Sequence, residues 1–168
     1  MKGKLTLALL GGGLCLVALG AVEKQPLLIY NPSPSAPIGW YKVTHTNSYQ
    51  IGDLVAANIP DWAADFAQSR GYLPENTPVI KTIIGAPGTQ FCVRDGVLIV
   101  SGFMPLNIHS FDSQGREMPV EQEGCRRLSA DELLLGSVRY DRSFDSRYFG
   151  SVQRTDLIGR VVFIGDAE

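Results

Sequence analysis

Two serines in a proline-rich stretch are the first residues whose type and spacing suggest chemistry. Ser33 and Ser35 lie two apart in Asn-Pro-Ser-Pro-Ser-Ala-Pro-Ile-Gly-Trp-Tyr, residues 31–41. The prolines fix φ and bias the preceding residues toward extended geometry, which predicts a stiff, non-helical segment. Around Ser35 the free donors are its own amide, the Ala36 amide and the Ser33 hydroxyl, a set suited to holding an oxyanion during acyl transfer. The alternative is a linker between an anchor and a domain.

A lysine within an apolar run is the second candidate. Residues 79–84 read Val-Ile-Lys-Thr-Ile-Ile, and this β-branched composition predicts a strand. Period-two alternation places Lys81 on the same face as Val79 and Ile83. Burial there would lower the pKa of the amine from roughly 10.4 toward neutrality and make it a usable general base. The alternative is a lysine that guards a sheet edge or extends its amine to water.

A polar segment near the C-terminus is the third candidate. Residues 143–150 read Ser-Phe-Asp-Ser-Arg-Tyr-Phe-Gly and combine hydroxyls, a carboxylate and a guanidinium. An ion pair between Asp145 and Arg147 would fix this loop, and Ser143 would be able to orient a neighbouring amine. The alternative is a polar surface turn.

Composition limits the other classes of function. The 168 residues suffice for one domain and one appended segment, and the formal net charge is −2. Because Lys and Arg are scattered, the chain has no basic patch for nucleic acid. The two histidines, His45 and His109, lie outside any metal-ligand spacing. We therefore expect no nucleic-acid partner, no metal site, no cofactor and no histidine-based triad.

The N-terminal residues predict a membrane anchor. Lysines precede an uncharged run, residues 5–22, which at about 1.5 Å per residue nearly spans the roughly 30 Å hydrocarbon core of a bilayer. The basic residues place the N-terminus in the cytoplasm, so residues 1–24 form the anchor and residues 25–168 an exported domain. The alternative is a cleaved signal peptide, with Ala18 and Gly20 at positions −3 and −1.

Cysteine positions predict one pairing. Cys15 falls inside the apolar N-terminal run, which leaves Cys92 and Cys125 in the globular part. In an exported domain, a disulfide between them would close a loop of about 30 residues and add on the order of 3 kcal/mol of stability. Two unrelated buried thiols are the alternative.

The remaining pattern is mostly β and predicts a mainly antiparallel β domain. Asp95-Gly96 is the expected turn of a hairpin between residues 90–94 and 97–101. Further strands are predicted from Trp40 onward and over residues 54–57 and 157–164.

Three further segments carry signals of secondary structure or exposure. Residues 61–70 predict a short amphipathic helix with Asp61 as N-cap and Gly71 after its end, either covering one end of the sheet through Trp62 and Phe66 or forming a lid or membrane-facing element. Residues 103–124 are polar and predict an exposed excursion without a site. Residues 129–136 fit either a helix with a capping box or a turn that enters a buried strand.

Taken together, these motifs resemble those of the signal peptidase I superfamily. The matching positions, in the order of the family, are Asn31-x-Ser33-x-Ser35-x-Pro37-x-Gly39-x-Tyr41, Gly52-Asp53-x-Val55, Lys81, and Ser143-x-Asp145-Ser146-Arg147-Tyr148-Phe149-Gly150. The resemblance covers nearly the whole chain and is strongest to the conjugal transfer branch, the TraF-type peptidases. The general box reads Ser-Met-x-Pro at the nucleophile, whereas Ser35-Ala36-Pro37 is one residue shorter, as in the transfer branch, which favours a dedicated substrate.

The resemblance assigns roles to individual residues. It implies that Ser35 is the nucleophile and Lys81 its general base, a dyad that needs no histidine. Ser33 and the Ser35 amide would form the oxyanion hole, and Ser143 would orient the lysine amine. Asp145 and Arg147 would form a structural ion pair near the site.

The resemblance also implies a fold and a function. The expected fold is a signal peptidase-like antiparallel β domain with a small helical insertion, behind an N-terminal transmembrane helix. The expected activity is endopeptidase cleavage of a pilin precursor or other exported protein, at the periplasmic face of a bacterial inner membrane. Hydrolysis of the acyl-enzyme and acyl transfer that gives a cyclic pilin are alternative outcomes. The alternatives are a noncatalytic, membrane-tethered periplasmic assembly protein and a secreted binding module released by cleavage after Gly20.

Overall fold

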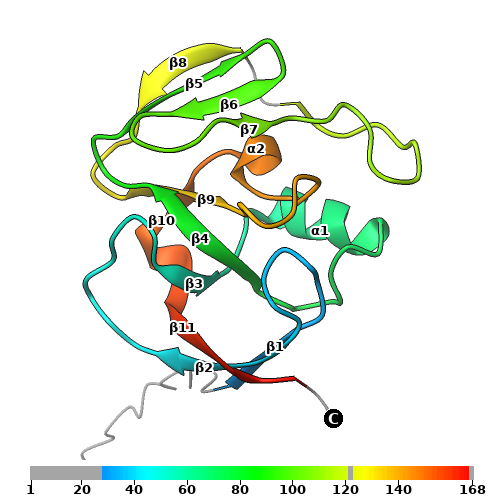
Figure 1. Cartoon of the computed structure of the whole chain (residues 1–168), viewed down its shortest axis with the longest axis vertical. Helices are drawn as coiled ribbons and strands as arrows, with labels where there is room; N and C mark the ends of the chain where they lie inside the picture. The colour runs from blue at the N-terminus through cyan, green and yellow to red at the C-terminus, as the bar shows by residue number, and fades with distance from the viewer. Residues whose placement is uncertain (1–27, 121–122, 167–168) are drawn as a thin grey trace, which may run out of the picture.

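The structure is a computed structural model that describes residues 28–120 and 123–166, and in this part of the chain the fold is mainly β (Figure 1). The described strands form two antiparallel sheets. In spatial order, the large sheet contains β1 (Leu28–Asn31), β2 (Gly39–Thr44), β11 (Leu157–Gly165), β3 (Leu54–Ala57), β4 (Val79–Gly85), β9 (Glu132–Gly136) and β10 (Val152–Gln153). The small sheet contains β7 (Leu106–Asn107), β6 (Val97–Val100), β5 (Gln90–Arg94) and β8 (Gly124–Arg127).

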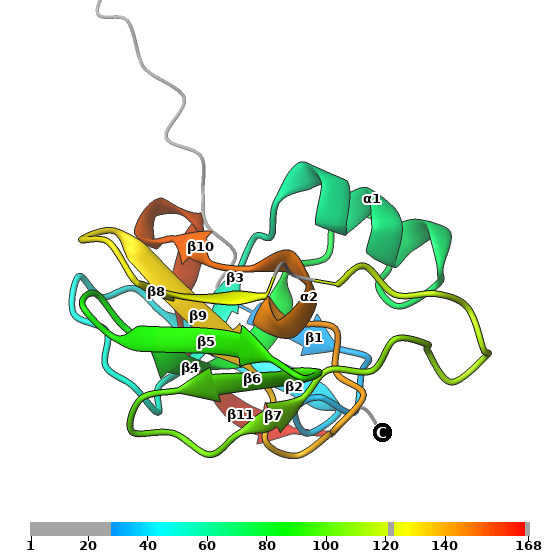
Figure 2. The same cartoon turned by 90° about the horizontal axis from the view of Figure 1, so that it is seen from above.

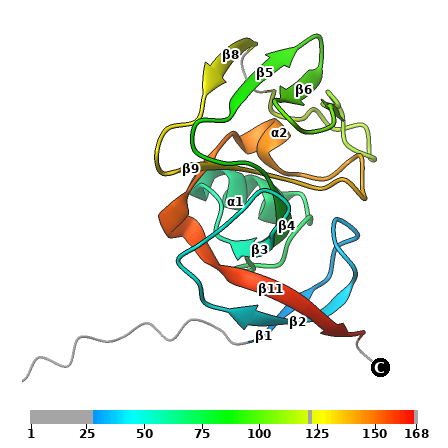
Figure 3. The same ribbon diagram turned by 60° about the vertical axis from the view of Figure 1, so that its left-hand side comes forward.

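The large sheet curls so that its two ends are far apart. Figure 3 shows β1, β2 and β11 crossing at the bottom, while β9 lies near the small sheet at the top. Register shifts in β11 and β4 accompany this curl, between Leu157 and Gly159, between Phe163 and Gly165, and between Ile83 and Gly85. The curl places the loop after β1 close to β4 in the middle of the sheet.

The small sheet is built on the predicted hairpin. Asp95 and Gly96 have positive φ values of 51° and 71°, as a two-residue hairpin turn requires, and they join β5 to β6. On the other side of β5, Cys92 lies directly opposite Cys125 of β8, and the two form a disulfide. The disulfide therefore fixes β8 to the centre of the small sheet.

Apolar side chains between the elements form two core clusters. The larger joins the two sheets, and the smaller lies among β1, β2, β3, β4 and β11. In β2 the side chains alternate, with Tyr41 and Val43 inward and Trp40 outward. In β4, which lies between β3 and β9, nearly every side chain is buried. A strand in this central position has little access to water on either face.

The helical insertion is α1 (Asp61–Ser69), between β3 and β4, and Figure 2 shows it along one side of the molecule. The N-cap is Pro60 rather than the predicted Asp61, which lies in the first turn and makes no side-chain cap hydrogen bond. Phe66 packs against the larger core as expected, but Trp62 remains 49% exposed, because Ala63 and Ala67 occupy the buried face. The helix therefore covers the sheet through Phe66 and the two alanines.

Two short helical elements complete the fold, α2 (Ser146–Phe149) and a 3₁₀ helix, η1 (Arg154–Asp156). Residues 129–136 form a turn that enters the buried strand β9, with the Ser129 amide donating to Glu132 Oε2 at 2.8 Å. Within residues 28–120 and 123–166, no helix has the length and apolar content needed to cross a membrane. The predicted anchor, residues 1–24, lies outside the described residues.

Candidate active site

A cavity of about 200 Å³ lies between the loop after β1, strand β4 and the chain that follows β7. It collects three of the motifs singled out in the sequence. Its lining includes Asn31, Ser33, Ser35, Tyr72, Leu73, Val79, Lys81, His109, Phe111, Asp112, Ser113, Met118, Tyr140, Ser143, Phe144 and Tyr148. A serine pair, a buried lysine and a third serine therefore share one cavity.

The Asn31 side chain shapes the loop that carries the two serines. Its Nδ2 donates to the carbonyl oxygens of Ser33 (2.8 Å), Ala36 (3.1 Å) and Pro37 (3.0 Å), and its Oδ1 accepts from the amide and hydroxyl of Ser33. The Tyr41 hydroxyl adds a bond to the Pro37 carbonyl at 2.7 Å. The predicted segment is non-helical as expected, but these bonds draw it into a compact turn rather than an extended strand.

Gly39 is required where this loop returns to β2. Its φ is +140°, a region that residues with a side chain rarely adopt, and a Cβ atom there would lie 2.4 Å from the carbonyl oxygen of Gly165. The glycine in the motif therefore allows β11 to pass close to the end of the loop.

Ser35 is held at both its hydroxyl and its carbonyl. The side chain is largely buried, with 7% of the residue exposed, and its Oγ lies 2.8 Å from Ser33 Oγ, with either atom able to donate. The carbonyl oxygen of Ser35 accepts a hydrogen bond from Ser137 Oγ at 2.7 Å. These contacts hold Ser35 Oγ in place on the cavity.

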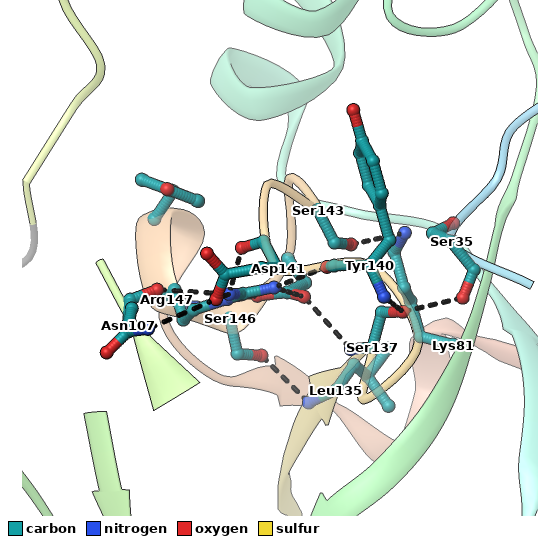
Figure 4. Close-up of polar contacts among 12 residues, drawn as sticks. Ser35, Lys81, Asn107, Leu135, Ser137, Tyr140, Asp141, Ser143, Ser146 and Arg147 are labelled. Carbon is teal, nitrogen blue, oxygen red and sulfur yellow. Dashed lines mark hydrogen bonds and ion pairs between the residues drawn. The ribbon is translucent and has the colours of Figure 1, made fainter. Parts of the chain in front are cut away.

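Lys81 is buried in β4, and only 5% of the residue is exposed. Its Nζ donates to Ser143 Oγ at 2.9 Å, and in Figure 4 the amine lies between Ser143 and Ser35. Burial lowers the pKa of Lys81 from 10.5 to about 8, although the Asp145 carboxylate opposes this change and Arg147 adds to it. A neutral amine is therefore accessible near physiological pH. Among the described contacts, Ser35 Oγ is bonded to Ser33 rather than to Lys81.

Asp145 and Arg147 form a fully buried, bidentate ion pair behind Lys81. Arg147 Nε and Nη2 donate to the two carboxylate oxygens, each at 2.8 Å, and Asp145 also accepts from the Arg147 amide at the start of α2. The remaining guanidinium protons bind the carbonyl oxygens of Asn107, Tyr140 and Asp141. Because both charges are well paired, the ion pair fixes the 137–147 loop without leaving an uncompensated charge.

Ser137 links this ion pair to the serine loop, and the sequence did not identify it. Its amide donates to Asp145 Oδ2 at 3.0 Å, while its hydroxyl donates to the Ser35 carbonyl (Figure 4). The only sequence signal is its place directly after the apolar run of β9. Periodicity does not reveal that a serine after a strand will contact a loop 102 residues away.

The prediction for residues 103–124 was wrong with respect to the site. His109, Phe111, Asp112, Ser113 and Met118 all line the cavity. Most of the segment is exposed, as predicted, but Asp112 and Met118 are buried or half-buried and the hairpin around them lies against the cavity. Within residues 28–120 and 123–166, no group of three or more His, Cys, Asp or Glu side chains lies together in a way that would hold a metal ion.

An antiparallel β domain with a serine hydroxyl and a buried lysine on one cavity defines a signal peptidase-like protein. The sequence matches the family "Signal peptidase, peptidase S26" over residues 4–165, and the chain belongs to this family. Similar proteins also indicate the branch of the family to which the chain belongs. The chain is 30% identical over 158 residues to the plasmid transfer protein TraF of Escherichia coli, covering 89% of this chain and 88% of the relative.

Two further relatives span the branch and the wider family. The conjugal transfer protein TraF of Agrobacterium tumefaciens (strain 15955) is 31% identical over 138 residues, 76% of each chain. Signal peptidase I of Leptolyngbya laminosa is 33% identical over 87 residues, 52% of this chain and 40% of the relative. The chain is thus a TraF-type member of the signal peptidase family.

Proposed function

We propose that this protein is a serine endopeptidase in which Ser35 is the nucleophile and Lys81 is the general base. The observation that carries the proposal is the buried Lys81 amine, with a pKa of about 8, on the cavity that also holds the Ser35 hydroxyl. Membership of a serine peptidase family supports the same assignment. A general base must be largely neutral near the working pH, and an exposed lysine is not.

In the proposed acylation step, neutral Lys81 removes the proton of Ser35 Oγ as this oxygen attacks a peptide carbonyl. Ser143 Oγ accepts a hydrogen bond from Lys81 Nζ at 2.9 Å and so directs the nitrogen lone pair toward Ser35. The oxyanion of the tetrahedral intermediate accepts from the Ser33 hydroxyl and the Ser35 amide. The Lys81 ammonium then returns a proton to the leaving amine, and the acyl group remains on Ser35.

Deacylation is proposed to use the same groups. Lys81, again neutral, takes a proton from the nucleophile that attacks the ester, and this nucleophile is either water or an amine. Water gives a shortened product, whereas the amino group of the same chain gives a cyclic product. The acyl-enzyme is common to both routes, so the choice depends on which nucleophile reaches it.

The proposed substrate is a pilin precursor or similar exported protein of a conjugal transfer apparatus. The names of the relatives, plasmid transfer protein and conjugal transfer protein, support this context. The proposed location is the bacterial inner membrane, with the catalytic domain in the periplasm. The apolar run at residues 5–22 and the Cys92–Cys125 disulfide, which suits an oxidising compartment, support it.

The test is processing of a candidate pilin precursor in cells that produce the full-length protein. Wild type should convert the precursor, and Ser35→Ala should leave it intact at an equal protein level. Ser113→Ala is the matched control, because Ser113 lines the same cavity without a proposed role. Product mass separates the two outcomes of deacylation, since a cyclic product is lighter by one water than the linear one.

Processing and conjugation measured in the same cells distinguish an enzyme from a noncatalytic assembly protein. If Ser35→Ala processes the precursor as wild type does, the peptidase assignment is wrong. If Ser35→Ala instead supports conjugation as wild type does, the protein acts as an assembly factor. N-terminal sequencing of the membrane-bound protein tests the anchor: a start at or next to Met1 indicates retention, and a start at Ala21 indicates a cleaved signal peptide.

A further inference from the structure

A short hairpin, residues 110–118, forms one wall of the cavity. The Met118 amide donates to the Ser110 carbonyl and the Asp112 amide to the Arg116 carbonyl, each at 2.9 Å, and Phe111 pairs with Glu117 in an isolated bridge. The hairpin contributes Phe111, Asp112, Ser113 and Met118 to the cavity lining. In Figure 1 it belongs to the long yellow-green loop beside α1.

The chain between α1 and β4 forms a neighbouring wall. It contributes Tyr72 and Leu73, and it then continues into β4, which carries Lys81. The Tyr72 ring packs at 5.9 Å from the ring of Phe144, whose neighbour Ser143 binds the Lys81 amine. Tyr72 therefore stands next to the proposed catalytic groups but comes from a different segment than the hairpin.

A single carboxylate joins the two walls. Asp112 Oδ1 accepts from the amides of Gln114 (2.8 Å) and Arg116 (2.9 Å), which closes the hairpin. Asp112 Oδ2 accepts from the Tyr72 hydroxyl at 2.6 Å and from Arg116 Nε at 2.7 Å. The side chain is 7% exposed. The Tyr72 hydroxyl also lies 3.3 Å from the Met118 sulfur, so both of its contacts reach the hairpin.

The charge on Asp112 is maintained in this position. Burial alone would raise the pKa of its carboxyl, but hydrogen bonds from Tyr72 and Arg116 outweigh burial and hold the pKa well below its usual range. Bonds to an ionised acceptor are about twice as strong as neutral ones. The connection between the hairpin and Tyr72 is therefore firm over the whole pH range in which a lysine-based peptidase would work.

The part of the cavity next to the Tyr72–Asp112 hydrogen bond is lined mostly by apolar side chains. Leu73, Val79, Met118, Phe144 and Tyr148 line it, next to Ser35 and Lys81. A peptide whose carbonyl carbon reaches Ser35 Oγ must place a neighbouring side chain in this space. Tyr72 and Met118 touch each other and both line this space, so their positions set where one of its walls lies.

We propose that the hydrogen bond from Tyr72 to Asp112 sets the width of the cavity and thereby selects the size of the apolar substrate side chain that fits beside Ser35. Tyr72 and Asp112 act as positioning residues, because they fix Met118 and Phe111 rather than touch the reacting atoms. This inference rests on the proposed peptidase function. One methylene group in an apolar pocket changes specificity by roughly 10- to 200-fold, so a small shift of this wall has a measurable effect.

The test uses Tyr72→Phe, which removes only the hydroxyl, with Tyr30→Phe on the exposed face of β1 as the matched control. The full-length protein in detergent is given peptides that span the processing site of the candidate pilin, with Gly, Ala, Val or Leu before the cleaved bond. Tyr72→Phe should raise kcat/KM for the largest of these residues relative to the preferred one by about tenfold. The readout is the ratio of kcat/KM between peptides, which a uniform change in activity would not move, and loss of a hydrogen bond to an ionised carboxylate should lower Tm by several degrees relative to the control.

A uniform loss of activity on all four peptides, or ratios within twofold of wild type, would overturn the inference. Met118→Ala is the second variant. It widens the cavity at the same wall but keeps both partners of the Tyr72–Asp112 hydrogen bond, and it should shift the kcat/KM ratio in the same direction. If Tyr72→Phe does not fold and Met118→Ala leaves the ratio unchanged, the inference is also overturned.

A binding measurement separates this inference from the proposed function. Dye-labelled forms of the same peptides are titrated against Ser35→Ala, with and without Tyr72→Phe, and Kd is measured by anisotropy. If wild type cleaves none of the peptides but the Kd ratio shifts about tenfold, the peptidase assignment fails and the selection of side-chain size stands. If wild type cleaves them and neither ratio shifts, only the inference fails.

Discussion

The pH dependence of activity tests the role of Lys81 most directly. Its pKa falls from 10.5 to about 8 on burial in β4, so at pH 7 about one molecule in ten carries the neutral amine. Since kcat/KM reports groups of the free enzyme, it should rise about tenfold per pH unit below the break and level off above about pH 8. A lysine exposed to water would place this break near 10.4 instead.

The same pKa predicts an effect on stability with a definite sign. Because the folded-state pKa lies below the unfolded-state value, the unfolded protein binds more protons between about pH 8 and 10.5, so stability rises with pH across that window. Below pH 8 both states are charged, and the burial of the ammonium costs about 3 kcal/mol, from 1.36 kcal/mol per pKa unit. Lys81→Met removes this cost and should raise Tm at pH 7 by up to about 10 °C.

Two variants separate a catalytic lysine from a structural one. Lys81→Arg keeps a positive charge, but guanidinium stays protonated, so the loss of a general base should lower kcat/KM by about 10²- to 10⁴-fold or more. Lys81→Met should be equally inactive although it is more stable. Lys42→Arg, on the exposed face of β2, is the matched control and should keep the wild-type profile.

The assay is cleavage of a pilin-derived peptide between pH 6 and 10, with Tm measured for each variant at pH 7. Near-normal turnover by Lys81→Arg would refute the Ser-Lys mechanism. A wild-type profile that stays flat between pH 6 and 9 would contradict the depressed pKa of Lys81.

Three further predictions concern the oxyanion donor Ser33, the buried ion pair and the disulfide. Ser33→Ala should slow single turnover about 10²- to 10³-fold by removing one oxyanion donor, whereas Ser35→Ala should show no turnover, and equal, complete loss in both would contradict the division of roles. Asp145→Asn leaves Arg147 buried without its counter-charge and should lower the free energy of unfolding by about 3–5 kcal/mol. Asp53→Asn, in the more exposed pair with Arg160, is the control and should cost about 1 kcal/mol or less. Equal losses in urea melts would refute this prediction. Reduction of the Cys92–Cys125 disulfide should cost about 3–4 kcal/mol, and alkylation of both cysteines before reduction would rule the bond out.

Local sequence patterns determined the strands and singled out Ser33, Ser35, Lys81 and Ser143, which line the candidate site. Alternation predicted a strand over residues 79–84 and a buried Lys81, and β4 is observed over Val79–Gly85. Asp95-Gly96 predicted the hairpin because few other residue pairs accept positive φ at both positions. These features depend on backbone preferences and on the period of one strand, which a single stretch of sequence contains.

The tertiary structure alone decided how the motifs meet. Lys81 and Ser143 are 62 residues apart, and Ser35 and Ser137 are 102 apart, so their contacts depend on the order β3-β4-β9 and on the curl of the large sheet. Asn31 turned a segment that its prolines predicted to be extended into a closed loop.

The segment at residues 103–124 also shows what local sequence patterns do not reveal. Its polar composition predicted exposure, and most of its residues are exposed, but composition does not indicate which polar groups pair with distant segments. In the folded chain Asp112 accepts four hydrogen bonds from Tyr72, Gln114 and Arg116, so a polar loop becomes a cavity wall. Pairing of this kind is a property of groups brought together from distant segments, and only the three-dimensional arrangement determines it.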